Sequence, residues 1–198
     1  MTAHPKVSLI AGLLFSLFAS VPACVATSQA ETATVDAVCE REMRAAAASE
    51  GVPLGILYAV GLTETGRGLK LHPFALNIEG KTVMTSSKRA ALDAVRKARK
   101  NGKKLIDIGC MQINHHYHSH QFSSLDEMID PHANVRYAAR FLKQLRARQG
   151  NWTMAVARYH AGPDNNPAQK RYVCAVIRNL VASKFGQWTT RSRAFCGR

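Results

Sequence analysis

Apolar and polar residues recur along most of the chain with the period of a helix. The segment after Asp130-Pro131 shows this most clearly, because Val135, Ala138 and Leu142 fall on one helical face. Ser124 and Glu127 just before it have the spacing of a capping box. Six helices are predicted between residues that commonly start or end them: 37–50, 53–65, 87–102, a long helix from 131, one from 151 to near 162, and one from 166 to about 186.

Two shorter segments have β character instead. Residues 74–86 alternate around Glu79-Gly80, as in a hairpin, and residues 104–114 are again rich in strand-forming side chains. The chain has 198 residues, of which 46% are hydrophobic and 20% charged, and this suits one globular domain. We therefore predict a predominantly α-helical α+β fold with a small β-hairpin segment.

The first thirty residues are expected to be an export signal. Lys6 is the only charged side chain in this segment, residues 7–21 are an apolar run, and SQA at 28–30 is a small-residue cleavage site. Cleavage there would leave a mature domain of residues 31–198 in the periplasm, without stable membrane insertion. A retained anchor helix and a lipid attached to Cys24 are the alternatives.

The net positive charge of the chain indicates which kinds of partner it can attract. The chain has 27 Lys and Arg against 13 Asp and Glu, and its net charge of +14 becomes +13 once Lys6 is removed with the signal. A strongly basic surface attracts polyanions. Nucleic acid is not expected, because an exported protein rarely meets it and the sequence has no recognised binding motif for it. An acidic envelope polymer is the better candidate, although a basic surface can also serve solubility alone.

Glu64 ends an otherwise apolar helix, which makes it the first candidate for catalysis. The residues three, four and seven positions before it are Gly61, Val60 and Leu57. A carboxyl group held over such a surface loses hydration, and this is expected to raise its pKa so that it can donate a proton near neutral pH. A Glu at a helix end can equally turn outward into water.

Four short motifs follow one another: TETG at 63–66, GCMQIN at 109–114, RYHAG at 158–162 and RYV at 171–173. In this order they resemble the motifs of the lytic transglycosylases, in the soluble lytic transglycosylase branch of the goose-lysozyme-like superfamily. The resemblance covers about residues 38–177 and implies a lysozyme-like fold. The chain differs from the family pattern by an extra helix, 87–102, inserted between the first two motifs, and by four replacements: Thr65 for Ser, Cys110 for Leu, Arg158 for Ala and His160 for Asn.

The resemblance implies that Glu64 is the catalytic residue, first as general acid and then as general base. It implies substrate contacts for six residues: Thr65, Met111, Gln112, Tyr159, His160 and Tyr172. The reaction would cleave the β-1,4 bond between N-acetylmuramic acid and N-acetylglucosamine in peptidoglycan without water, leaving 1,6-anhydromuramyl ends. No cofactor or metal is expected. Such enzymes often accompany secretion, conjugation or flagellar assembly, and we expect a monomer.

Two other functions suit the same features. A lysozyme-type muramidase would hydrolyse the same bond with a second carboxylate, for which Glu79 and Asp107 beside the β segment are the candidates. A non-catalytic cell-wall-binding protein would need neither acid. Product analysis separates the first alternative from a transglycosylase, and loss of activity in Glu64→Ala separates an enzyme from a binding protein.

The cluster HHYHSH at 115–120 raises the possibility of a metal enzyme. Its spacing differs from the HExxH zinc motif, and the cluster contains no Asp or Glu to act as a further ligand or base. Sugar contact or a titrating surface is the preferred interpretation.

Export would leave four cysteines in the mature chain, Cys39, Cys110, Cys174 and Cys196, in an oxidising compartment. Two disulfides can form among them in three ways, although buried cysteines can also stay free. We favour Cys39–Cys110 with Cys174–Cys196. If the helix of 37–50 folds back along the next helix, Cys39 would lie near Glu64 and so near the second motif.

Overall fold

The computed structural model describes residues 1, 37–65, 70–161 and 166–197. The predicted signal beyond Met1, with its cleavage site, lies outside them. The elements belong to the second of two compact units, residues 33–198. Its helices are α1 (Val38–Glu50), α2 (Leu54–Thr65), α3 (Lys88–Lys100), α4 (His115–His118), the 3-10 helix η2 (Ser119–Gln121), α5 (Leu125–Ile129), α6 (Pro131–Gln149), α7 (Trp152–Ala161), α8 (Asn166–Ala182) and α9 (Thr190–Cys196). Its strands are β1 (Ala75–Ile78), β2 (Lys81–Met84), β3 (Ile106–Ile108) and β4 (Ile113–Asn114). Within the described ranges, no helix is both long and apolar enough to cross a membrane.

The predicted α+β class is confirmed, and each of the six predicted helices is present, including the inserted helix α3. Asp130 caps α6 as expected, because its carboxylate accepts hydrogen bonds from the first backbone N–H groups of that helix. The capping box at α5 forms only by half: Ser124 caps the helix, but the Glu127 carboxylate accepts its hydrogen bonds from Ser123 instead. Helix α9 was not predicted, since its 7 residues are too few to show a period.

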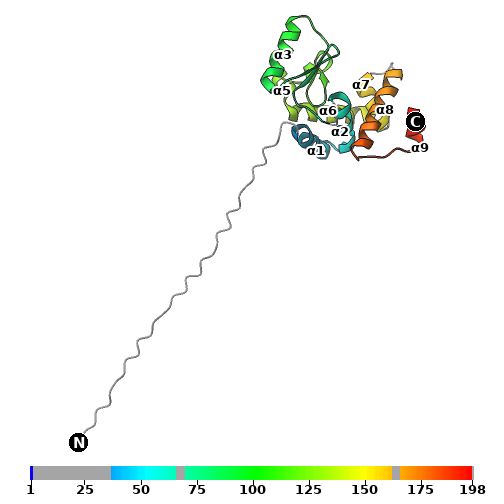
Figure 1. Ribbon diagram of the computed structural model, residues 1–198, viewed down its shortest axis with the longest axis horizontal. Helices are drawn as coiled ribbons and strands as arrows, with labels where there is room; N and C mark the ends of the chain where they lie inside the picture. Colours follow the sequence, from blue (N-terminus) through cyan, green and yellow to red (C-terminus); the bar gives the residue numbers. More distant parts are fainter. Residues whose placement is uncertain (2–36, 66–69, 162–165, 198) are drawn as a thin grey trace. The chain divides into compact units, whose positions relative to one another are not determined.

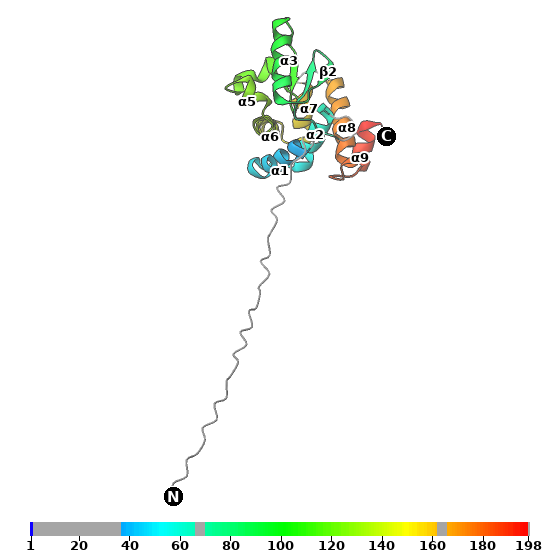
Figure 2. The same cartoon turned by 60° about the vertical axis from the view of Figure 1, so that its left-hand side comes forward.

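Helix α2 is the central element of the unit. It is apolar on every side, and α1 and α8 both pack against it. In two views it lies between α3 on one side and α8 with α9 on the other (Figures 1 and 2). Gly61 permits this close packing, because a Cβ atom there would lie 2.5 Å from Met43 Cε and 3.0 Å from Leu71 Cδ2. The middle of the helix that carries Glu64, residues 57 and 59–62, is therefore held in the core.

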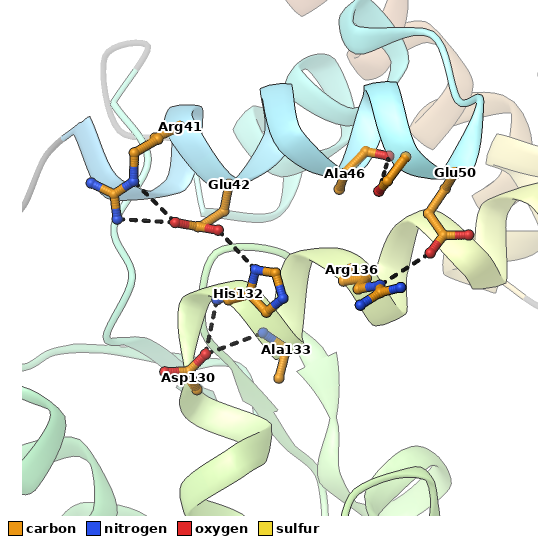
Figure 3. A network of polar contacts seen from close by, with 9 residues as sticks. Arg41, Glu42, Ala46, Glu50, Asp130, His132, Ala133 and Arg136 are labelled. Atoms are coloured by element: carbon orange, nitrogen blue, oxygen red, sulfur yellow. Dashed lines mark hydrogen bonds and ion pairs between the residues drawn. The ribbon is translucent and has the colours of Figure 1, made fainter.

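Helix α1 lies along α6, and two ion pairs join their facing sides (Figure 3). Glu42 Oε2 is 3.1 Å from His132 Nδ1, and Arg136 Nε donates a 3.2 Å hydrogen bond to Glu50 Oε1. The two carboxylates are largely covered, with side chains 14% and 12% exposed. These contacts fix the register of α6 against α1, which matters because α6 in turn supports the sheet.

The four strands form an antiparallel sheet in the order β2–β1–β3–β4. The predicted hairpin of β1 and β2 is confirmed, and its turn has positive φ angles at Glu79 (48°) and Gly80 (86°), as type I′ turns require. Register pairs Asn77 with Asp107 and Asp107 with Asn114. Because paired residues share a face, these three polar side chains form one row across the sheet. The alternate residues Leu76, Ile108 and Ile113 face the core.

The turn that joins β3 to β4 is held by a buried side chain of α6, Asn134. Asn134 Nδ2 donates to the carbonyls of Ile108 at 2.9 Å and Met128 at 3.0 Å, and its Oδ1 accepts from the Met111 N–H at 3.0 Å. Gly109 is required here, since its φ is 80° and a Cβ atom would lie 2.9 Å from Asn134 Nδ2. One amide thus satisfies three backbone groups of the second motif and its surroundings.

Both predicted disulfides are confirmed. Cys39–Cys110 joins the first turn of α1 to the turn between β3 and β4, and Cys174–Cys196 joins α8 to α9. Each pair has a Cα–Cα distance of 5.7 Å, within the usual range. The replacement of Leu by Cys110 in the second motif therefore fastens that motif to α1.

The two disulfides should differ in their contribution to stability. They close loops with sequence separations of 71 and 22 residues, and a longer loop restricts the unfolded chain more. We expect a loss of about 4 kcal/mol in the free energy of unfolding for the double variant Cys39→Ala/Cys110→Ala, and of about 3 kcal/mol for Cys174→Ala/Cys196→Ala. Urea unfolding of both variants measures this, and a clearly larger loss in the second would contradict it.

Replacing Asn134 with Leu should be costly despite the similar branched shape, because the Met111 N–H and the Ile108 and Met128 carbonyls lose their buried partner. We expect a loss of about 3 kcal/mol in the free energy of unfolding. Gln144→Leu, at an exposed position of the same helix, is the matched control and should change stability by less than about 0.5 kcal/mol. Equal effects of the two substitutions in urea unfolding would show that the turn does not depend on Asn134.

Candidate active site

A cleft of about 410 Å³ lies along the polar row of the sheet and the ends of α2 and α7. Its polar row is formed by Asn77, Asp107 and Asn114, whose register is given above. The residues that line the cleft come from seven or more separate segments of the chain: Glu64, Asn77, Glu79, Gly80, Leu105, Asp107, Gln112, Ile113, Asn114, Tyr117, His118, Phe141, Tyr159 and His160. The cleft combines polar side chains of the sheet with apolar and aromatic side chains, so it can both hydrogen-bond to a ligand and pack against it.

Glu64 lies in the last turn of α2 and forms part of the cleft wall. Its side chain is 16% exposed, and the buried residues Val60 and Gly61 lie one turn behind it. The hydroxyl of Tyr172 in α8 donates a 2.6 Å hydrogen bond to Glu64 Oε1. The carboxyl group is therefore directed into the cleft and fixed through one of its two oxygens.

His160 is the second group beside this carboxyl. Its Nδ1 is 3.7 Å from Glu64 Oε1, which is within ion-pair distance but long for a hydrogen bond. Its ring stacks on Tyr172 with centroids 4.2 Å apart and planes within 2°. The Glu64 carboxylate raises the pKa of His160, burial opposes this, and the Asp107 carboxylate adds to the increase. An imidazole thus places a titrating cation where the family has an uncharged Asn.

Tyr159 and Tyr172 both act as hydrogen-bond donors inside the site. Burial raises the pKa of each phenol well above its ordinary value of 10.0, and the negative charge of Glu64 adds to the effect. The Tyr159 hydroxyl donates a 2.9 Å hydrogen bond to the Met111 carbonyl. One tyrosine therefore orients the carboxyl group, while the other joins α7 to the turn of the second motif.

Asp107 brings a second carboxyl group to the same cleft. Burial raises its pKa, a 2.7 Å hydrogen bond from Asn114 Nδ2 opposes this, and the charge of Glu64 raises it further. Glu79 lines the cleft as well, but Lys103 Nζ donates to its Oε2 at 2.9 Å and the Lys104 N–H donates to its Oε1 at 3.2 Å. Of the two acids, Asp107 is the one placed to interact with a bound substrate.

Most of the six predicted contact residues have side-chain groups committed to the protein, including the hydroxyls of Tyr159 and Tyr172. Thr65 Oγ1 donates to the Gly61 carbonyl at 2.9 Å, and Met111 is fully buried in the core. Gln112 lines the cleft, but its Nε2 donates to the carbonyls of Ala75 and Gly109, both at 2.9 Å. These residues hold the end of α2 and the turn in place, whereas Tyr159 and His160 line the cleft and Tyr172 contacts Glu64 directly.

Four cleft residues were not expected from the sequence: Asn77, Leu105, Asn114 and Phe141. Tyr117 and His118 belong to the cluster at 115–120, for which sugar contact was one of the two preferred interpretations, and both line the cleft. Tyr117 and Leu105 are 61% and 45% exposed, so the cleft carries open apolar surface of the kind that packs against sugar rings. The alternation of polar residues in the strands was the available signal for Asn77 and Asn114. The place of Phe141 in the cleft depends on how α6 packs against the sheet.

The histidine cluster is divided by the turn of α4. His118 lines the cleft, its Nδ1 is 2.8 Å from the Tyr137 hydroxyl, and its ring contacts Phe141. His115 and His116 lie on a different surface, described below. In the part of the chain that the structure describes, no group of three or more His, Cys, Asp or Glu is arranged to hold a metal ion.

The fold and the cleft together define a class of protein: a lysozyme-like domain in which an acid at the end of a buried helix faces a polar cleft along a small sheet. A family model named the transglycosylase SLT domain matches residues 43–180, and the chain belongs to this family. Searches of curated proteins and of solved structures gave no match. Family membership supports peptidoglycan lytic transglycosylase activity in general, and the inserted helix α3 lies inside the matched range.

The contact between Glu64 and His160 should stabilise the fold in a pH-dependent way. A raised pKa means that the folded protein binds the imidazole proton more tightly than the unfolded chain does. The stabilisation is therefore fully present at pH values below 6.5, the ordinary pKa of a histidine, and it is lost as the pH rises through the raised pKa of His160. The difference in melting temperature between the wild type and His160→Asn should shrink from pH 6 to pH 8.5.

Because His160 is half-exposed, this effect should be modest. The control is the same His160→Asn substitution made in a Glu64→Gln background, where most of the pH dependence should disappear. A pH dependence that is unchanged by Glu64→Gln would assign the stabilisation to another group.

Proposed function

We propose that this protein is a lytic transglycosylase that cleaves the β-1,4 bond between N-acetylmuramic acid and N-acetylglucosamine, with Glu64 as its catalytic residue. The observation that carries the proposal is the position of Glu64, half-buried at the cleft wall with its Oε1 accepting the Tyr172 hydrogen bond. Oε2 is then the oxygen that would carry and deliver the proton. Family membership supplies the substrate class.

In the first step, protonated Glu64 donates its proton to the glycosidic oxygen, and the bond between that oxygen and the anomeric carbon breaks. The acetamido oxygen of the substrate supports the positive charge that develops on the anomeric carbon, as in other substrate-assisted glycosidases. In the second step, the muramyl 6-hydroxyl oxygen attacks the anomeric carbon, and its proton passes to the Glu64 carboxylate. The acid is regenerated, a 1,6-anhydro ring forms, and no water is consumed.

Two neighbours hold the Glu64 carboxyl group in place for these steps. Tyr172 can donate its hydrogen bond throughout the reaction, because its phenol keeps its proton. His160 Nδ1 lies 3.7 Å from the same oxygen, so its imidazole is the nearest titrating group to the carboxyl. We assign Asp107 and the two asparagines of the polar row to hydrogen bonds with the sugar.

A muramidase remains the competing function, and one observation favours it: Asp107 occupies the same cleft as Glu64. A hydrolase would use Asp107 as a base for water or as a nucleophile. Its carboxyl group already accepts a hydrogen bond from Asn114, which suits a residue that orients substrate. The two functions give different products and can be separated directly.

The place of action forms part of the proposal. Peptidoglycan lies outside the cytoplasm, so an enzyme that cleaves it must be exported, and the signal proposed for residues 1–30 would provide this. The mature protein would begin at Glu31 and act in the periplasm as a monomer with a charge of +13 after loss of Lys6. A secretion, conjugation or flagellar assembly is the proposed setting. A periplasmic protein that retains Met1 by mass spectrometry would refute the cleavage.

The main test is the product of digestion. Wild-type protein should release muropeptides with 1,6-anhydromuramyl ends, each lighter by one water molecule than the corresponding hydrolysis product. Glu64→Gln should reduce the rate by about 10²-fold or more, because it removes the proton donor while keeping the shape. Glu79→Gln and Asp107→Asn, made singly, should retain much more activity. Mass spectrometry of digested sacculi measures the products and rates of the wild type and the three variants.

Each other outcome assigns a different function. Products that end mainly in reducible muramic acid, with Asp107→Asn as inactive as Glu64→Gln, would establish a muramidase. Wild-type rates in Glu64→Gln would remove Glu64 from the mechanism. Binding to sacculi without any cleavage would establish a wall-binding protein.

A further inference from the structure

A second hollow, with a volume of about 290 Å³, lies at the C-terminal end of the inserted helix α3. We call it the basic groove, and it is lined by Arg99, Gly102, Lys103, Lys104, His115 and His116. Its arginine and both lysines are exposed, and no acidic side chain is among the described residues that line it. The groove therefore presents positive or titrating groups from two elements, the end of α3 with its following loop and the helix α4.

Cations at the end of α3 have a simple explanation, since the C-terminal carbonyl groups of any helix favour positive charge. This accounts for Lys97, Arg99 and Lys100 in the last turn. It does not account for Lys104, which follows the helix, or for the histidines that α4 contributes. The positive groups of the groove therefore come from two elements, and the end of one helix does not explain them.

The charges in the groove are only partly neutralised by the protein. Lys103 Nζ pairs with Glu79 at 2.9 Å, whereas the ion pairs of the described residues do not include Arg99 or Lys104. Burial lowers the pKa of His115, and the positive charge of Arg99 and the neighbouring His116 lower it further. An anion bound here would relieve this repulsion.

The groove and the catalytic cleft share a wall. Lys104 lines the groove and the next residue, Leu105, lines the cleft; likewise Asn114 lines the cleft and the next residue, His115, lines the groove. Because consecutive residues line the two hollows at both places, the hollows adjoin, and the groove is the nearest site that a group branching from a polymer in the cleft could enter. Peptidoglycan carries such groups, because stem peptides with free carboxylates branch from its muramic acid residues.

We propose that the basic groove binds the stem-peptide carboxylates of the glycan strand in the adjacent cleft, and so makes the enzyme prefer peptide-bearing strands to bare ones. This inference rests on the proposed function. The proposed occupant is a stem-peptide carboxylate. The groove adjoins the cleft along two chain segments, and the stem peptide is covalently attached to the glycan strand that the cleft would bind. The inserted helix α3, which ends at the groove, is then a specificity element.

The test compares two substrates and two double variants. The substrates are intact peptide-bearing strands and the same strands after an amidase has removed the peptides. Arg99→Gln/Lys104→Gln removes two charges from the groove, and Lys143→Gln/Arg148→Gln removes two exposed charges from α6 as a matched control. At low salt, the groove variant should lose about fivefold in kcat/KM on peptide-bearing strands, mainly through KM, and less than about twofold on bare strands.

The control variant should behave as the wild type on both substrates, and the wild-type preference should weaken at high salt. Equal losses of the groove variant on both substrates, or no wild-type preference for peptide-bearing strands, would overturn the proposal. If the wild type cleaves neither substrate, the proposed function fails instead. Co-sedimentation of Glu64→Gln protein with the two kinds of strand then tests the groove by itself, and equal binding to both would overturn it.

Discussion

The buried amide of Asn134 is the contact on which the site depends. It satisfies three backbone groups at once, and it does so at the turn of the second motif. That turn sets the register of β3 and β4 and places the Met111 carbonyl where Tyr159 can donate to it. The Cys39–Cys110 disulfide fastens the same turn to α1, so covalent and polar constraints converge on a few residues.

The chemistry of the cleft depends on a balance among few charges. A buried phenol and a half-exposed imidazole flank Glu64: the phenol donates a hydrogen bond to its carboxyl group, and the imidazole lies at ion-pair distance from the same oxygen. Tyr172 donates at any physiological pH because its phenol stays protonated, whereas the contribution of His160 changes with pH. In the mechanism proposed for Glu64, that residue first gives and then takes a proton, and Tyr172 can donate to it during both steps.

The loop that follows the inserted helix α3 is joined to the hairpin turn. Lys103, just after it, pairs with Glu79 at the hairpin turn, and the Glu79 N–H donates to the Leu105 carbonyl at 2.9 Å. These contacts fix the segment that separates the cleft from the basic groove. An insertion at this point can alter what the enzyme accepts without disturbing Glu64, which the core holds from the other side through α2.

The sequence by itself determined the helices, the hairpin, the order of the motifs and the candidacy of Glu64, because helical period, turn residues and local burial are properties of neighbouring residues. It also favoured the right disulfides, although three pairings were open. It could not decide whether Met111 lines the cleft or fills the core, or which of Glu79 and Asp107 is placed to meet a substrate, since this depends on how the strands, α4 and α6 pack together. Asn134 gave no signal, because its partners lie 6 to 26 residues away in sequence and meet only in the folded chain. The tertiary structure alone decided which polar residues face one another, since that depends on strand register and helix packing.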